Sequence, residues 1–222
     1  MKQLFYTSVF LLLISCGNNQ TADNSLALTN NKTNVEFPIE AKIKTPNLPV
    51  ADTLIATVNK THFLITPEGK MFWGENPADT IRLLTDVTIE KAFLHLNGDT
   101  LLIFYTETDN DGATSRFEKI NLASRQRILK AEIQGFNLGL PYIIGNFAYV
   151  TTLGTVGKLN LDNGQYAYQY IDLYDHKKYS FNSFDTIIFK DNLTFFLSEN
   201  RNSKRIDSLI VNEKTGDRTI KK

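Results

Sequence analysis

This sequence of 222 residues has one cysteine, one tryptophan, six prolines and no excess of charge of either sign. A single cysteine excludes a disulfide framework within the chain. Because 24 basic and 24 acidic side chains balance, the sequence also lacks the basic surface that nucleic acid binding requires. After the first residues no apolar run approaches the ~20 residues that a transmembrane helix needs. These absences exclude a disulfide-stapled scaffold, a nucleic acid partner and a membrane-spanning helix in the mature chain.

The first fifteen residues have the pattern of an export signal. Lys2 supplies the positive charge, and the apolar run Val9 to Ile14 is too short to span a bilayer as a mature helix. The next residues, Leu13-Ile14-Ser15-Cys16, resemble the bacterial lipobox, in which a small residue precedes a cysteine. The resemblance implies cleavage before Cys16, a thioether-linked diacylglycerol on its sulfur and a further acyl chain on its new amine.

Several acyl chains together make a stable membrane anchor. The sequence therefore predicts a signal peptide over residues 1–15 and a mature lipoprotein of the cell envelope, held at the membrane through Cys16. Gly17 stands where an aspartate would retain some lipoproteins at the inner membrane. By resemblance to lipoprotein sorting signals, this favours the outer membrane.

The residues after the cysteine are poor in large apolar side chains. Residues 17–34 hold six asparagines and three threonines and cannot bury enough surface to order themselves. A flexible coil of this length spans roughly 25 Å, and Pro38, Pro46 and Pro49 stiffen the chain as it approaches the folded part. We therefore predict a tether over residues 16–49 and one folded domain over residues 50–222.

The predicted domain is all-β. β-Branched and aromatic residues dominate short runs separated by Gly, Asn and Asp turn signals, with 15 Phe and 9 Tyr in the chain. One segment, Thr85–Leu96, fits a short helix as well as a strand. The strand-like runs are TLIATV, HFLIT, TLLIFYTET, RFEKINL, YIIGNFAYVTTL, KLNL, YAYQYIDL, TIIF, LTFFLSE and DSLIV.

The turns between these runs repeat. ITPEGKMFW (65–73), LNLDNGQYAY (159–168) and VNEKTGDRTI (211–220) each read as a strand, a Gly-centred turn and a strand, and INLASRQRI (120–128) is a fourth copy without the glycine. The unit is about four strands in roughly 40–55 residues. It resembles a blade of a β-propeller of the quinoprotein or WD-repeat type, which implies about four blades of antiparallel hairpins. A β-sandwich built from the same hairpins is the alternative.

One acidic loop has the spacing of a calcium site. The carboxylates of Glu107, Asp109, Asp111 and Glu118 match the ligand spacing of an EF-hand loop, with Gly112 at its sixth position. Strand-like runs flank the loop where helices would be needed. We therefore expect a solvated hairpin loop, with a weak calcium site as the alternative.

A second motif, Asp-[Ser/Thr]-aliphatic, occurs five times. It fits a strand start, because Asp closes a turn and a β-branched pair opens the next strand. It also resembles the O-glycosylation acceptor of some envelope-exporting bacteria. The acceptor hydroxyls would be those of Thr53, Thr80, Thr100, Thr186 and Ser208.

Signatures of catalysis are absent from the sequence. The histidines (His62, His95 and His176) have no metal-ligand spacing, and there is no Gly-x-Ser-x-Gly elbow. Trp73 stands alone, so the quinone cofactor of tryptophan-rich propellers does not carry over, and no cofactor is expected. We therefore expect a non-catalytic binding or scaffolding module with an envelope protein or glycan as partner. The alternatives are an envelope enzyme acting on glycan or peptide through carboxylates, and a lipid-handling β-sandwich lipoprotein.

Overall fold

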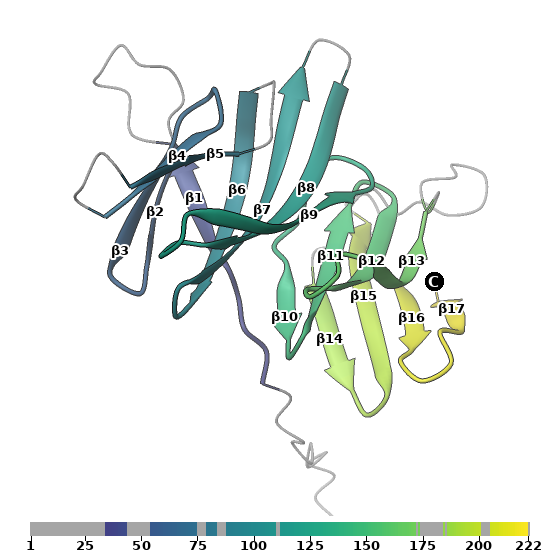
Figure 1. Cartoon of the computed structure of the whole chain (residues 1–222). Coiled ribbons are helices and arrows are strands. Elements are labelled where there is room, and N and C mark those ends of the chain that lie inside the picture. Colours follow the sequence, from purple (N-terminus) through teal and green to yellow (C-terminus); the bar gives the residue numbers. More distant parts are fainter. Residues whose placement is uncertain are drawn as a thin grey trace, which may run out of the picture. The chain divides into compact units, whose positions relative to one another are not determined.

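The computed structural model describes residues 34–43, 54–74, 79–83, 88–109, 112–171, 173, 184, 186–200 and 205–221. Every regular element in these ranges is a β-strand, and each strand pairing is antiparallel (Figure 1). The all-β prediction is confirmed. The strands are β1 (Ile39–Ile43), β2 (Leu54–Val58), β3 (Thr61–Ile65), β4 (Lys70–Trp73), β5 (Thr80–Arg82), β6 (Thr88–Asn97), β7 (Thr100–Asp109), β8 (Gly112–Asn121), β9 (Gln126–Ile133), β10 (Tyr142–Ile144), β11 (Phe147–Thr152), β12 (Thr155–Asn160), β13 (Tyr166–Tyr170), β14 (Thr186–Lys190), β15 (Leu193–Asn200), β16 (Arg205–Asn212) and β17 (Arg218–Lys221).

Sixteen of the strands form four consecutive meanders of four strands each: β2–β5, β6–β9, β10–β13 and β14–β17. In every meander the first and second strands are joined by a two-residue turn. Such tight turns match the twist of the strands when a residue adopts positive φ. The turns are Asn59-Lys60, Gly98-Asp99, Gly145-Asn146 and Asp191-Asn192, and each contains at least one residue with φ between 48° and 69°. This regularity confirms that the chain is built of antiparallel hairpin repeats.

The first two meanders are fused into one nine-stranded sheet by β1, which lies between β2 and β6. Ala41 is opposite Ala92 of β6, and Lys42 is opposite Ile55 of β2. Just before β1, Glu36 forms an isolated bridge with Ile143 of β10. Residues 39–43, within the predicted tether, thus form a strand that joins the first strands of consecutive meanders.

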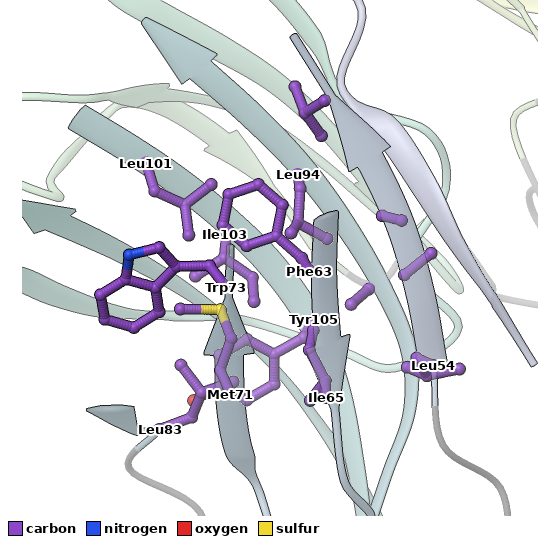
Figure 2. Close-up of a cluster of buried hydrophobic side chains, with 14 of the residues drawn as sticks. Leu54, Phe63, Ile65, Met71, Trp73, Leu83, Leu94, Leu101, Ile103 and Tyr105 are labelled. Carbon is purple, nitrogen blue, oxygen red and sulfur yellow. The ribbon is translucent and has the colours of Figure 1, made fainter. Parts of the chain in front are cut away.

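The meanders stack face to face through three apolar clusters. We call the face of a meander that is directed toward the next meander its forward face, and the opposite face its rear face. Figure 2 shows the first cluster, in which Phe63, Ile65 and Trp73 of the first meander pack against Leu94 and Ile103 of the second. The second cluster joins the second and third meanders, with Phe93, Phe104, Phe117, Ala148, Val150 and Leu159 among its members. The third joins the third and fourth, with Tyr149, Val156, Ile187, Phe196 and Leu209.

The Gly-centred turns form where the sequence predicts them. Gly69, Gly164 and Gly216 all have φ near +70°, and Arg125 takes positive φ in the turn that lacks glycine. Three of these turns join the third and fourth strands of a meander. The turn at Gly69 instead joins β3 and β4, the second and third strands of its meander. The ambiguous segment Thr85–Leu96 is a strand from Thr88 onward.

The sheets that result are one of nine strands and two of four, so four separate blades are not confirmed. The face-to-face stacking also suits the sandwich alternative. Across the described ranges no helix has the length and apolarity to cross a membrane.

Candidate functional site

Two hollows flank the β6–β7 turn of the second meander. The first, about 330 Å³, lies on the side of the first meander and is lined by Gly98 and Asp99 of this turn. The second, about 300 Å³, lies on the side of the third meander and is lined by Asn97 and Thr100. One short hairpin turn therefore contributes to both hollows, which together form the candidate functional site.

The first hollow combines an aromatic ring with charged groups. Trp73 at the end of β4 lines it together with Asp79, Asp99 and Arg125. Arg125, in the β8–β9 turn, donates to Asp79 and forms an ion pair with it. The hollow therefore combines the edge of a largely buried indole with carboxylates and a guanidinium, which are hydrogen-bonding groups of both kinds.

The second hollow is lined by polar side chains from three parts of the chain. His95 Nε2 lies 3.1 Å from Glu36 Oε2, just before β1. On the opposite side, Lys119 Nζ donates to Asp162 Oδ1 at 3.0 Å and to the carbonyl of Leu161 at 3.3 Å. Asn146 donates to the second oxygen of the same carboxylate at 2.5 Å. The hydrogen bonds from Lys119 and Asn146 lower the pKa of Asp162 below its ordinary value, which keeps this carboxylate charged beside the lysine.

The contact that the lysine makes at the second hollow is repeated in the next meander. Lys119 and Lys158 stand two residues before Asn121 and Asn160, the last residues of β8 and β12. Each lysine reaches the turn of the following meander, Lys119 at Asp162 and Lys158 at Glu213. Asn121 accepts a backbone N–H of its own turn through its side-chain oxygen, as do Asn160 and Asn212. These turns are therefore fixed in the same way in three meanders.

Glu213 gathers four donors between the third and fourth meanders. Its carboxylate accepts hydrogen bonds from Lys158 at 2.6 Å, Tyr168 at 2.8 Å, Tyr149 at 3.1 Å and the Thr194 hydroxyl. Burial alone would raise the pKa of Glu213, but these bonds, led by that of Lys158, outweigh burial and lower it. Burial and the neighbouring carboxylate raise the pKa of both tyrosines. With every lone pair occupied, this carboxylate is a cross-sheet clamp rather than an open binding group.

Two of the calcium candidates are buried and paired with arginines. Glu118 is fully buried, accepts from Tyr105 at 2.7 Å and forms an ion pair with Arg127 at 2.5 Å. Glu107 is 5 % exposed and pairs with Arg116. Within the described ranges no three His, Cys, Asp or Glu side chains gather as metal ligands. Asp111 and the side chain of Asp109 lie outside those ranges, so the calcium alternative stays a prediction.

The Asp-[Ser/Thr]-aliphatic motifs mostly mark strand starts. Thr80, Thr100 and Thr186 are the first residues of β5, β7 and β14. Ser208 differs, because it lies inside β16 beside the buried Asp207. All four hydroxyl residues are at least partly exposed, and Thr53 lies outside the described residues, as do residues 1–15, Cys16 and His176.

Apart from Thr100, a predicted acceptor that lines the second hollow, the residues of the hollows and of the clamp were not predicted as site residues from the sequence. A signal for part of them is present, because Lys119-Ile-Asn-Leu122 and Lys158-Leu-Asn-Leu161 repeat and Ile210-Val-Asn-Glu213 is a third copy. In this alignment Glu213 stands where the other copies have leucine. The backbone N–H groups of Leu122, Leu161 and Glu213 each bond the carbonyl of the two-residue turn of their own meander, at Asp99, Asn146 and Asn192. Glu213 is thus the exceptional residue of the repeat.

Comparison with known proteins gives no family. No protein-family model matches the chain, and no curated protein matches it. Among solved structures, the crystal structure of the computationally designed Ika4 protein is similar over 75 % of this chain and 88 % of that chain, with 12 % identity and a TM-score of 0.41. The function is therefore argued from the site alone.

Proposed function

We propose that this chain is a membrane-anchored lipoprotein of the cell envelope, with the outer membrane as its location, that binds a glycan or protein partner without turning it over. The observation that supports binding is the pair of polar hollows on the two sides of one hairpin turn. The lipobox resemblance at Cys16 supports the anchor. A domain confined to the membrane meets other envelope components at a raised effective concentration, which helps even a weak contact.

We also propose that the four meanders are the blades of a propeller-like array. Two observations support this arrangement. The meanders follow one another along the chain, and in each of the three clusters the forward face of one meander packs on the rear face of the next. In a sandwich two layers are sufficient, whereas here the second and third meanders are each covered on both faces.

In-cell cross-linking tests the binding site. A photoreactive amino acid in place of Asp99, between the hollows, should link the full chain to a partner on illumination. The same group in place of Lys214, an exposed residue of the β16–β17 turn, serves as the matched control and should not capture that partner. Identical products from both positions, or none from Asp99, would contradict a binding site at the β6–β7 turn.

One observation favours the enzyme alternative: Asp79 and Asp99 both line the first hollow, and paired carboxylates are the groups of glycoside hydrolysis. The variants Asp79→Asn and Asp99→Asn separate the two functions. If the protein only binds its partner, neither the wild type nor the double variant cleaves that partner. If the protein is an enzyme, the wild type degrades a glycan that either single variant leaves uncleaved.

We further propose that exposed hydroxyl groups of the Asp-[Ser/Thr]-aliphatic motifs are O-glycosylated. Thr186, exposed at the start of β14, is the most accessible of the described acceptors. It lies on the same face of β14 as Ile188, so a glycan here would keep a second copy of the chain off this face. Intact-mass analysis of protein from its own host should show added hexose-type mass that falls by one glycan in Thr186→Val. Unmodified native protein would leave the strand-start explanation alone.

A further inference from the structure

Each forward face in this chain is matched by a rear face except at the two ends of the stack. The forward faces of the first, second and third meanders are covered by the rear faces of the second, third and fourth. This leaves the forward face of the fourth meander and the rear face of the first. In the described residues neither face contributes to any of the three apolar clusters.

Both end faces carry the same row of side chains. On the rear face of the first meander, Ile55, Leu64, Phe72 and Thr80 are neighbours across β2, β3, β4 and β5. On the forward face of the fourth meander, Ile188, Phe195, Ile210 and Thr219 are neighbours across β14, β15, β16 and β17. Each row is three large apolar residues followed by a threonine. In both rows the apolar residues keep solvent contact, and Ile188 is 47 % exposed.

We propose that these two faces bind each other between two copies of this chain, the fourth meander of each copy covering the first meander of the other. A second copy is the occupant that the stack itself specifies. It supplies a rear face for the forward face that none of the described meanders covers, and a forward face for the free rear face. The contact between the copies repeats the sheet-on-sheet packing already made three times within the chain. Two such contacts related by a two-fold axis close the assembly as a dimer.

Charged side chains also lie on both faces. Lys70 lies on the rear face of the first meander, 5.1 Å from the ring centroid of Phe72, and Lys221 lies on the forward face of the fourth, opposite Ser208. The apolar row is the feature that the two faces share, so apolar burial drives the contact, and added salt should leave the dimer intact.

Disulfide trapping of the full chain in cells tests the pairing. The chain has only Cys16, so engineered cysteines meet no other thiol in the domain. When differently tagged Leu64→Cys and Phe195→Cys chains are co-expressed and oxidised, we expect a covalent heterodimer. Chains with only one of these substitutions should stay monomeric on the gel, as should Leu64→Cys paired with Lys214→Cys. A chain with both substitutions should give a covalent dimer.

Each other result overturns the proposal. Phe195→Cys linked to itself means that like faces pair. A ladder of higher species from the double variant means an open filament, and an internal bridge means closure within one chain. Absence of any product means that the faces are free or that a different protein covers them.

Native mass spectrometry of the detergent-solubilised full chain gives an independent measurement. The wild type should be dimeric, and Ile188→Asp should raise the apparent dissociation constant by about tenfold or more, since a buried unpaired carboxylate opposes the contact. Ile128→Asp is the matched control, because Ile128 is 53 % exposed on β9, away from both rows, and it should leave the dimer intact. A monomeric wild type, or equal loss in both variants, would refute the dimer.

Discussion

Glu213 and Leu161 occupy the same place in consecutive meanders, yet one side chain is a carboxylate and the other packs in an apolar cluster. The exchange is tolerated because Lys158, Tyr168, Tyr149 and Thr194 supply donors. A buried carboxylate without such partners would cost several kcal/mol. The clamp thus ties the third meander to the fourth through the donors Lys158, Tyr168 and Tyr149, at the position where Leu161 makes apolar contacts between the second and third.

The lowered pKa of Glu213 gives the clamp a defined pH dependence. A carboxyl group whose pKa is lower in the folded than in the unfolded chain contributes stability that is fully present above the unfolded value, near 4.5, and is lost as pH falls through the folded value. Glu213→Gln should therefore lower the free energy of unfolding at neutral pH and flatten its decline below pH 5. Urea denaturation across this pH range measures both effects. Glu90→Gln, at an exposed position, is the control, and equal curves for the two variants would refute the assignment.

Substitutions at Gly164 and Gly216 distinguish the cost of backbone strain from the cost of a steric clash. Both have φ near +70°, where an L-residue is strained by about 1–2 kcal/mol. A Cβ at Gly164 would also lie 2.8 Å from Ala131 Cβ of the neighbouring meander, whereas a Cβ at Gly216 meets nothing within 4 Å. Gly164→Ala should therefore destabilise the domain by roughly 1 kcal/mol or more beyond Gly216→Ala. Chemical denaturation of both variants tests this, and equal losses would mean that the meanders do not pack closely at this turn.

At the scale of elements, the sequence predicts most strands and their turns but not how they are joined. Runs such as LTFFLSE alternate in burial and are bounded by Gly or Asn, so local chemistry defines them. β1 was missed because it lies in the proline-containing stretch that predicts a tether, and its partner strand β6 is distant in sequence. The hollows were missed for the same reason, since the pairing of β1 with β6 is what brings Glu36 to His95.

The role of β1 is tested by two substitutions on opposite faces of the strand. Ala41 is 5 % exposed in the first apolar cluster, while Lys42 is exposed. Ala41→Glu should lower the free energy of unfolding by about 3 kcal/mol or more, because it buries an unpaired charge. Lys42→Glu should change it by less than about 0.5 kcal/mol. Thermal or urea unfolding distinguishes the strand from a free tether. In a free tether neither substitution would change the free energy of unfolding.

At the scale of the whole molecule, the proposed anchor is tested at Cys16. Cys16→Ala should abolish incorporation of labelled palmitate and leave the precursor uncleaved by the lipoprotein signal peptidase, since the acylated cysteine is what that enzyme recognises. Ser8→Ala, just before the apolar run of the signal, is the control and should be labelled normally. Normal labelling of Cys16→Ala would refute the lipoprotein assignment.

The position of β1 also determines how the domain responds to force. Tension on the chain before residue 34 reaches the fold at Glu36 and then runs along β1, between β2 and β6. Antiparallel ladder bonds lie perpendicular to the strands, so such a pull loads the bonds on both sides of β1 in shear, many at once. At the other end of the described fold, β17 is an edge strand with a single neighbour, β16. A load applied from the N-terminal side is therefore shared between two meanders through β1, whereas a load on β17 is passed to β16 alone.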